Sequence, residues 1–462
     1  MCAGVKVLLF AALGAASGAA LTACASGPRN QRPEVSVPVA WRELAVDWRP
    51  AAPAAVTAAP WWKGFADPVL DGLETRIDVS NQTLKAAAAS YAMATAAVKE
   101  DRAGYWPTVA VAADESRAAK GASPATNIKS AGATASWEPD VWGRVRRTVE
   151  ASRAAAAASA DDLAATRLAL QAALATDYFE LRIQDRVQTL LDSTVRGYQQ
   201  ALQITQNRYQ AGVAARADVV TAQTQLLGVQ AQQLNAGIQR AQLEHAIAIL
   251  VGQPPASFEL PATTLPATVP AVPVDVPSAL LQRRPDVAAA ERLVAAANAG
   301  IGVARSAYFP ALTIGASDSY ANTMVGALFS LPNRVWSFGP GLVATLFDGG
   351  ARHARVAQTR AAYDQSVANY RQSVLVAIQE VEDALVNLRL LQRQAGVEGT
   401  LVASAHEAEN LTLNQYKAGT VPYSSVISAQ ATALSAEQTA LGVLRSRLTG
   451  TVSLIAALGG GM

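Results

Sequence analysis

The histidines and carboxylates of this chain are the residues that could carry out acid–base or metal chemistry. His245, His353 and His406 lie far apart, and none has a partner at metal-ligand spacing. The carboxylates that lie close together fall inside strongly helical stretches, where a charged helix face accounts for them. They are Asp161, Asp162, Glu380, Glu382 and Asp383. With no zinc-protease, phosphate-loop or serine-hydrolase motif, the sequence predicts no catalytic residue, no metal and no cofactor, and therefore no enzyme.

A cysteine near the amino terminus has a different chemistry. Lys6 precedes an apolar run from Val7 to about Ala20, which predicts a secretory signal peptide over residues 1–23. The run ends in Leu-Thr-Ala-Cys24, which resembles a bacterial lipobox and implies that Cys24 carries a lipid such as palmitate. An ordinary signal peptide followed by a chance cysteine is the alternative. Since Cys2 would be removed, one cysteine would remain, and no internal disulfide is possible. Alanine after Cys24 resembles the signal for export to the Gram-negative outer membrane.

Composition favours packed helices over a large globular core. Hydrophobic residues make up 51% of the chain, many of them alanine, whereas aromatic residues make up only 6%. A net charge of +2 argues against a nucleic-acid partner. No stretch after the signal reaches the roughly 18 charge-free apolar residues of a transmembrane helix. The mature chain would therefore be held in a membrane by its lipid alone, or by strands.

The chain repeats itself at long period. Tyr-Gln-Ala-Gly-Val at 209–213 returns 207 residues later as Tyr-Lys-Ala-Gly-Thr at 416–420. Arg-Ala-Gly-Tyr-Trp-Pro at 102–107 returns 203 residues later as Arg-Ser-Ala-Tyr-Phe-Pro at 305–310. These matches predict an internal tandem duplication, in which each half is one structural unit.

Apolar residues at heptad spacing predict very long helices in each half, at about 143–210 and 216–251 and again at about 350–417 and 422–458. A helix of that length would reach on the order of 100 Å. A further helix should begin at Asp67-Pro68 and break near Ser80-Asn81. The predicted segments are a proline-rich arm at 24–66, a first repeat at 67–253, a linker at 254–276 and a second repeat at 277–462.

Short stretches of period-two alternation lie between the helices and predict two strand hairpins, at about 106–138 and 310–347. Soluble hairpins packed on helices would alternate in the same way. Aromatic residues near the strand ends favour a membrane barrel instead, and two hairpins cannot close a barrel, so several chains must contribute. Thr313 and Gly315 should face the lumen. The residues expected to face lipid are Trp137, Leu312, Ile314, Trp336, Phe338 and Leu342.

Several blocks in order carry a resemblance over nearly the whole mature chain. They include Ser-Trp-Glu-Pro-Asp-Val-Trp-Gly-Arg at 136–144, Leu-Gln-Arg-Arg-Pro-Asp-Val at 281–287 and Leu-Phe-Asp-Gly-Gly at 346–350. The chain resembles the outer membrane factor (TolC) family, and within it the lipoprotein branch that forms the exit ducts of resistance-nodulation-division efflux pumps. The resemblance implies a mainly α fold in which a homotrimer shares one β-barrel, four strands from each copy, above a periplasmic α-barrel tunnel. It also implies a periplasmic adaptor protein and an inner-membrane transporter as partners.

The helix–turn–helix tips of the two halves would then form the periplasmic mouth. Glycine can adopt the left-handed conformation that such a helix stop needs. The tip and gate candidates are Arg208, Tyr209, Gly212, Arg216, Asp218, Tyr416, Lys417, Gly419, Tyr423, Ser424 and Ser428. Many relatives carry an acidic residue where this chain has Ser428. Asp218 is therefore the expected acidic member of the gate, and the alternative is that these residues merely cap a turn.

The favoured function is a passive outer membrane exit channel for small hydrophobic or toxic compounds, working with an adaptor protein. The alternatives are an exit duct for type I protein secretion, or a periplasmic coiled-coil lipoprotein without a pore. The lipobox and the proline-rich arm favour efflux over protein export, and the alternating strands argue against a simple coiled coil.

Overall fold

The computed structural model describes residues 27–43, 60–119, 121, 124–263, 269, 270, 272, 274, 277 and 283–460. Cys24 and the predicted signal peptide lie outside the described residues. The chain divides into two compact units. The strand unit comprises residues 1–35, 89–161 and 289–372, and the tip unit comprises residues 36–88, 162–288 and 373–462.

The helices repeat in matched sets, which confirms the predicted duplication. The first half contains a helix of 22 residues, one of 67 and one of 35, and the second half contains helices of the same three lengths. In the first half they are α3 (Gln82–Ala103), α4 (Arg144–Gln210) and α5 (Arg216–Leu250). In the second half they are α7 (Pro285–Ser306), α8 (Ala351–Lys417) and α9 (Tyr423–Ala457).

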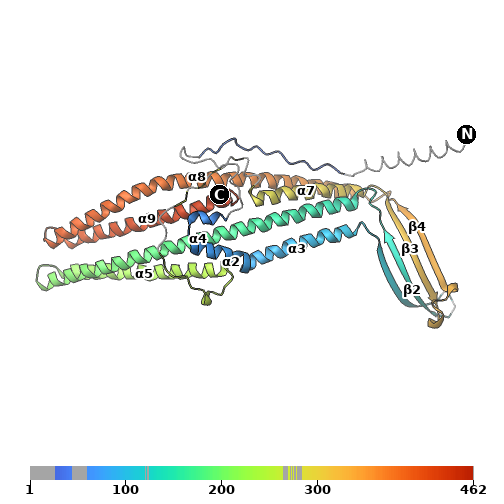
Figure 1. The fold of residues 1–462 in the computed structure, drawn as a ribbon, viewed down its shortest axis with the longest axis horizontal. Coiled ribbons are helices and arrows are strands. Elements are labelled where there is room, and N and C mark those ends of the chain that lie inside the picture. Colours follow the sequence, from blue (N-terminus) through green and yellow to red (C-terminus); the bar gives the residue numbers. More distant parts are fainter. Residues whose placement is uncertain are drawn as a thin grey trace. The chain divides into compact units, whose positions relative to one another are not determined.

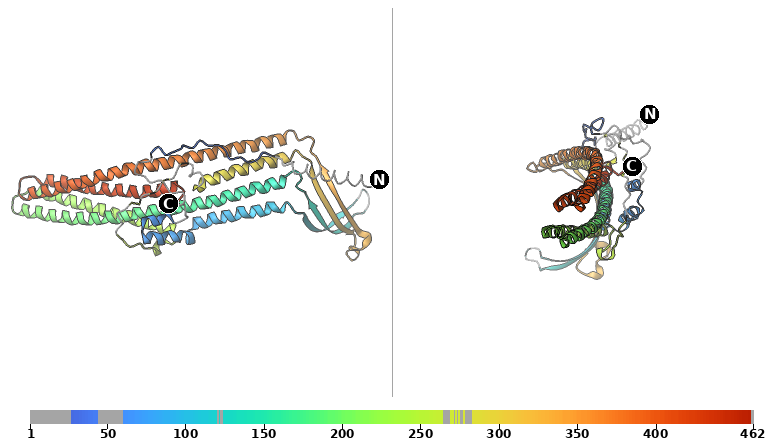
Figure 2. Two further views of the ribbon diagram at one scale, coloured as in Figure 1. Left: turned by 45° about the horizontal axis from the view of Figure 1, so that its top comes forward. Right: turned by 90° about the vertical axis from the view of Figure 1, so that its left-hand side faces the viewer.

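The heptad positions hold the helices of the tip unit together. Leu191, Val195 and Tyr198 of α4 pack against Leu226 and Val229 of α5 in one buried cluster. Figures 1 and 2 show α4 beside α5 and α8 beside α9 as antiparallel pairs. A seam of side chains spaced by three and four residues buries one stripe of each helix, so pairs of long helices suffice without a large globular core.

Several aromatic residues of the tip unit gather just before the next helix. A short 3-10 helix, η1 (Trp61–Phe65), places Phe65 against Phe179 of α4, with 4.7 Å between ring centroids. The next helix, α2 (Pro68–Ser80), begins as predicted, because the Asp67 carboxylate accepts hydrogen bonds from the backbone N–H groups of Val69 and Leu70. It ends at Ser80, where Asn81 caps the start of α3, and this confirms the predicted break.

The strand unit contains one antiparallel sheet of four strands in the order β1-β2-β3-β4. The strands are β1 (Thr108–Ala118), β2 (Thr126–Trp137), β3 (Ala311–Asn322) and β4 (Arg334–Val343). Each half supplies one hairpin, and the β2–β3 pairing joins the halves. Two 3-10 turns, η3 (Val325–Ala327) and η4 (Leu331–Asn333), lie in the β3–β4 connection. The predicted strand segments are confirmed (Figure 1).

The described part of the amino-terminal arm lies along the helices in both units. In the strand unit, Arg32 forms an ion pair with Glu291 of α7 at 3.0 Å. In the tip unit, the backbone N–H groups of Arg42 and Glu43 donate to the carboxylate of Glu382 at 2.9 and 3.0 Å. Glu382 therefore binds the arm, which gives this carboxylate a structural role.

One described helix, α7, is long and apolar enough to cross a membrane by length and composition. Of its most apolar 18-residue window, 44% is buried within the structure. The ion pair between Glu291 and Arg32 also lies on this helix. These features fit a packed helix of the strand unit.

Candidate functional site

The strand register sorts the side chains of the sheet onto two faces. Directly paired residues of antiparallel strands share a face, and residues two apart along a strand share it too. Leu312 pairs with Leu342, and Ile314 pairs with Trp137 on its other side. All six residues expected to face lipid fall on this face, which we call the apolar face. Thr313 and Gly315 fall on the opposite, inner face.

No described residue of β1, β2, β3 or β4 is buried, so neither face of the sheet is covered by the described part of the chain. Every residue of β1 is exposed, and β4 is exposed at all but one position. Trp336 and Phe338 of the apolar face are 69% and 71% exposed. The alternative of soluble hairpins packed on helices is therefore wrong, because such hairpins would bury one face.

The inner face carries small and hydroxyl side chains. On β3 it presents Thr313, Gly315, Ser317 and Ser319 in succession, and the Ser317 hydroxyl bonds to that of Ser337 across the strands at 2.8 Å. These short polar groups can meet water without reaching far from the sheet. On β3 the period-two alternation therefore separates a face of small and hydroxyl side chains from the apolar face.

A belt of exposed and half-exposed aromatic side chains lies where the strands meet the helices, and most of it is not among the residues that the sequence predicts to face lipid. Trp106 and Phe347 are 74% and 88% exposed. Trp142 stacks on Phe309 with 4.8 Å between ring centroids and donates its indole N–H to the Pro310 carbonyl at 2.7 Å. The signal was present, because aromatic residues recur in both copies of the repeat before the proline. Such belts mark membrane–water interfaces in outer-membrane barrels.

At the other ends of the long helices, two glycines form matched helix stops. Gly212 and Gly419 have φ angles of 74° and 79°, the left-handed region that glycine adopts without strain. The N–H of Gly212 donates to Tyr209 O, and the N–H of Val213 donates to Arg208 O, which is the Schellman pattern. The same pair of bonds recurs at Gly419 and Thr420. The sequence prediction that these glycines end the long helices is confirmed.

Arg208 connects the two tips within one chain. Its guanidinium donates to the backbone carbonyls of Tyr416 and Lys417 at the carboxyl end of α8, at 3.0 and 3.2 Å, and the Tyr416 carbonyl also accepts from the N–H of Gly419. The same group lies 4.7 Å from the centre of the Tyr416 ring. Tyr416 in turn packs against Tyr423, with ring centroids 5.2 Å apart.

The tip candidates differ in how far their side chains are exposed. Tyr416 and Tyr423 are buried, and burial raises the pKa of the Tyr423 hydroxyl. Asp218 is half-buried close to Tyr423 and forms no ion pair with any described residue of the chain. The exposed candidates are Tyr209, Gly212, Arg216, Lys417, Gly419, Ser424 and Ser428. The structure thus brings Arg208, Tyr416 and Tyr423 together and leaves the exposed set free for contacts outside the chain.

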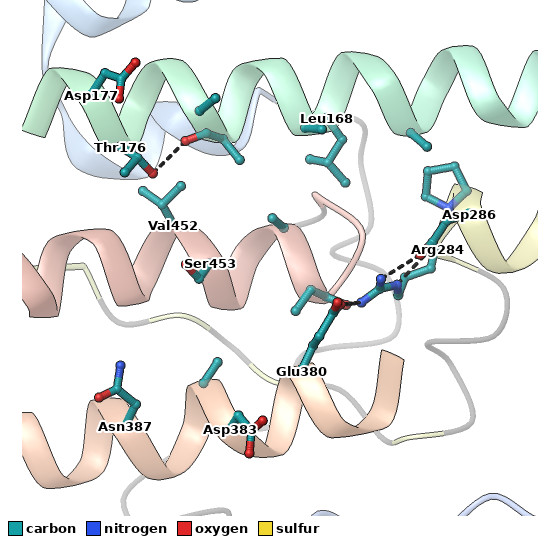
Figure 3. A pocket seen from close by; sticks show the side chains of 18 residues that line it. Leu168, Thr176, Asp177, Arg284, Asp286, Glu380, Asp383, Asn387, Val452 and Ser453 are labelled. Atoms are coloured by element: carbon teal, nitrogen blue, oxygen red, sulfur yellow. Dashed lines mark hydrogen bonds and ion pairs between the residues drawn. The ribbon is translucent and has the colours of Figure 1, made fainter. Parts of the chain in front are cut away.

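A cavity of about 1020 Å³ lies in the tip unit between α4, α8 and α9 (Figure 3). Alanines of α4 form much of its wall, and Arg284 bridges Asp286 at 2.7 Å and Glu380 at 2.5 Å. The ion pair with Arg284 thus gives Glu380 a structural role. Burial, with a contribution from Glu180, raises the pKa of Asp177 in the wall to about 6. No cluster of three histidine, cysteine or carboxylate side chains could hold a metal ion within the described residues.

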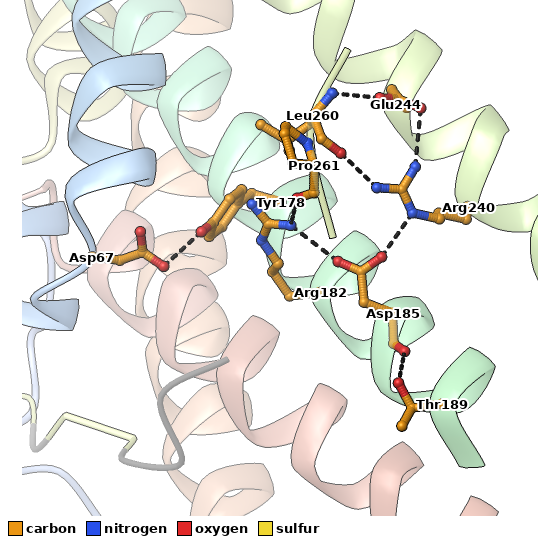
Figure 4. A network of polar contacts seen from close by, with 9 residues as sticks. All are labelled: Asp67, Tyr178, Arg182, Asp185, Thr189, Arg240, Glu244, Leu260 and Pro261. Carbon is orange, nitrogen blue, oxygen red and sulfur yellow. Dashed lines mark hydrogen bonds and ion pairs between the residues drawn. The ribbon is translucent and has the colours of Figure 1, made fainter. Parts of the chain in front are cut away.

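A buried polar network fixes the chain after α5 to the helices (Figure 4). Asp185 of α4 accepts from Arg182 at 3.0 Å and from Arg240 of α5 at 2.7 Å. These arginines then donate to the backbone carbonyls of Pro261 and Leu260, respectively. The network explains why two arginines and an aspartate lie on otherwise apolar helix faces, and it gives them a structural role.

The three histidines do not form a cluster. His406 of α8 lies between Glu437 of α9 and Glu409 of its own helix, the second at 3.5 Å from Nδ1. This contact joins α8 to α9. His245 and His353 lie in α5 and α8, in different units.

The comparisons with known proteins agree with this geometry. The sequence model for "Outer membrane efflux protein" matches residues 76–253 and 276–460. The chain is 30% identical over 452 residues to the probable efflux pump outer membrane protein TtgC of Pseudomonas putida, covering 96% of this chain and 93% of that protein. It is 28% identical over 447 residues to the cation efflux system protein CusC of Escherichia coli, covering 96% of each.

Solved structures give the same result. The outer-membrane channel OprN superposes with a TM-score of 0.87 at 28% identity, covering 95% of this chain and 99% of that one. The family model matches both halves of the chain, the long helices and the four-stranded sheet match a solved channel, and these similarities span nearly the whole chain. This chain is an outer membrane channel of an efflux pump, not an enzyme, and it belongs to the outer membrane efflux protein family.

Proposed function

We propose that three copies of this chain form one passive conduit, which carries small hydrophobic compounds from the periplasm to the exterior. In this assembly the sheets close into one barrel and the helices form a tunnel that ends at the tips. A periplasmic adaptor protein and an inner-membrane resistance-nodulation-division transporter would engage the tips and drive transport. The main support for this proposal is that the two edge strands of the sheet lack hydrogen-bonding partners on one side.

Within the described residues, β1 and β4 each pair on one side only. A sheet in a membrane cannot leave edge N–H and C=O groups without partners, because lipid offers no hydrogen bonds. Four strands cannot close on themselves. Pairing of β4 in one copy with β1 in the next satisfies both edges and yields a closed barrel.

The helices of the tip unit also carry unpartnered seams. On α5, Val220, Leu227 and Leu234 repeat every seven residues and are 52%, 57% and 71% exposed. On α8, Leu390, Val397 and Leu411 are spaced by seven and fourteen residues and are also exposed. Exposed apolar stripes at heptad spacing are typical of helices that pack on another chain. We assign them to the contact between neighbouring copies.

The inner face of the sheet supports a broad cargo range. Its β3 positions are small or hydroxyl-bearing, and Asp114 of β1 is the one charged side chain that the register of the described strands places on this face, so the face offers little to select one solute. The tips, rather than the barrel, would then control passage. Selection of the compound would lie with the inner-membrane transporter.

Cys24 would anchor each copy through its lipid. Gly27, three residues later, packs so closely on α7 that a Cβ there would lie 2.7 Å from Cα of Gly302. Since one acyl chain gives only weak membrane binding, the barrel should supply most of the affinity. Cys24→Ser should abolish labelling by palmitate, and persistent labelling would contradict the lipid assignment.

Single-channel conductance of the purified protein in a planar bilayer, with oligomer mass measured alongside, tests the conduit. We expect trimers with stable conductance. Leu227→Glu should lower trimer yield, because it places a charge in the proposed seam. Thr221→Glu adds the same charge at an exposed position off the stripe and should assemble normally. A monomer that conducts, or a trimer without conductance, would refute the proposal.

A further inference from the structure

The apolar face changes character toward the hairpin turns. From Leu312 through Ile314 to Ala316, its positions on β3 are apolar, and their partners Leu342, Pro340 and Phe338 on β4 are apolar as well. The next position is Asp318, which shares the face because it pairs with Trp336. Asp318 accepts two hydrogen bonds from Arg334, at 2.8 and 2.9 Å. A charge pair on this face marks the level at which the hydrocarbon ends, since lipid-facing charges are costly near the membrane midplane.

Cations continue along this face beyond that level. Lys129 of β2 pairs with Asn322, the last residue of β3, and forms an ion pair with Glu115 at 3.5 Å. Arg117 lies two residues beyond Glu115 on β1 and therefore shares its face. It forms no ion pair among the residues that the structure describes. Three cations therefore stand against two acids on this rim of the sheet.

The connection between β3 and β4 adds apolar surface beside these cations. Phe329 packs edge-on against Tyr320, with 5.5 Å between ring centroids. Tyr320 pairs with Arg334 and so lies on the apolar face, which means that the connection folds toward that face. Phe329 is nevertheless 70% exposed, and Met324 and Leu331 beside it are exposed as well.

From these contacts we infer that Arg334, Lys129 and Arg117, with the β3–β4 connection, form a binding surface for anionic, phosphate-bearing lipids of the outer leaflet. The exposed apolar side chains would contact the lipid carbons next to the headgroups, at the edge of the hydrocarbon, and the cations would contact the phosphate. Asp318 occupies two of the five N–H donors of Arg334, which leaves three for a phosphate oxygen. The surface goes beyond the conduit function, although it relies on the apolar face meeting lipid.

The test measures which lipids the purified trimer retains. Trimers are equilibrated in mixed micelles with equal amounts of phosphatidic acid and phosphatidylcholine, and retained lipids are counted by native mass spectrometry. We expect the parent protein to retain several-fold more phosphatidic acid. Arg117→Gln alone should reduce this ratio, and Arg117→Gln with Lys129→Gln should bring it within about twofold of one. The preference should also weaken as salt is raised.

Two matched variants separate charge from folding. Arg117→Lys with Lys129→Arg keeps both charges and should retain the preference. Arg393→Gln removes one exposed cation from α8, far along that helix from the sheet, and should leave the ratio unchanged. Equal retention of the two lipids by the parent trimer, or an undiminished preference in the double glutamine variant, would overturn the inference. Either result is compatible with normal conductance, so it would leave the proposed conduit intact.

Discussion

The most unusual single residue is Glu74 on α2, which is completely buried. Neither carboxylate oxygen has a hydrogen-bond partner among the described residues. Burial raises its pKa to about 9, with further contributions from Asp78 and Asp71. Leu70, Leu73 and Ile77 share the buried stripe of this helix, so Glu74 occupies a position that helical periodicity would assign to an apolar side chain.

Glu74 should make the protein less stable as pH rises. The folded chain keeps its proton up to about pH 9, whereas the unfolded chain releases it near the ordinary pKa of 4.5. The contribution of Glu74 to the free energy of unfolding is therefore greatest below pH 4.5. It falls between pH 4.5 and pH 9, by at most about 1.4 kcal/mol per pH unit. Glu74→Gln should raise the apparent Tm at pH 8 and change it little at pH 4.

Thermal unfolding of parent and variant across this pH range, in one detergent and at one heating rate, measures the effect. Glu100→Gln, which changes an exposed carboxylate on α3, serves as the control and should leave the pH profile unaltered. If Glu74→Gln raises the apparent Tm by the same amount at pH 4 as at pH 8, protonation of Glu74 does not cause the pH dependence of stability.

Among the structural elements, the glycines that end the long helices have the same backbone conformation but different surroundings. Gly212 and Gly252 both follow a long helix and have φ angles of 74° and 69°. A Cβ at Gly212 would meet nothing within 4 Å, whereas at Gly252 it would lie 2.4 Å from the backbone oxygen of Ser80. Gly252 therefore also provides room for the junction of α2 and α3.

Alanine substitutions should separate these two roles. Gly212→Ala should cost about 1–2 kcal/mol, the ordinary penalty of the left-handed conformation. Gly252→Ala should cost clearly more, because the backbone around Ser80 must also move. Apparent Tm values of both variants measure the effect, and we expect the larger decrease for Gly252→Ala. Equal losses would mean that the Ser80 contact relaxes freely.

The sheet offers a second prediction at this scale, because adjacent residues of β3 lie on opposite faces. Ile314→Arg should impair membrane assembly, since a charge on a lipid-facing position costs about 2–4 kcal/mol near the midplane. Thr313→Arg puts the same side chain on the inner face, where water can reach it. Trimer recovery and heat-modifiable gel mobility compare the two. Equal yields would contradict the assignment of the apolar face to lipid.

Local pattern could predict most of the elements but not the contacts between them. The duplication, the heptads and the tip glycines are periodic or positional signals, and each is realised in the helices and strands described. Arg208 and Tyr416 are 208 residues apart, and nothing near either residue in the sequence indicates the partner. The same holds for Phe329 on Tyr320, because irregular connections lack a period from which a contact could be inferred.

At the scale of the whole molecule, the proposed conduit raises the question of which contacts would hold the tips closed. Within one copy, Arg208 links α4 to the carboxyl end of α8 through two carbonyls and the Tyr416 ring. Between copies, an ion pair at the tips would have to use Asp218, because it is the only acid among the tip candidates and position 428 of the second tip is a serine. An exposed pair contributes only about 0–1 kcal/mol, but a trimer repeats it at every interface.

These two links should respond differently to salt. Arg208→Ala should raise basal conductance without adaptor at both low and high salt, because it removes short-range contacts with a buried ring. Asp218→Ala should raise conductance at low salt, and the difference from the parent should shrink as salt screens the pair. Glu407→Ala removes an exposed acid higher on α8 and is the control for net charge. If Asp218→Ala leaves an intact trimer with unchanged conductance at low salt, the closed mouth depends on packing of Tyr416 and Tyr423 rather than on charge.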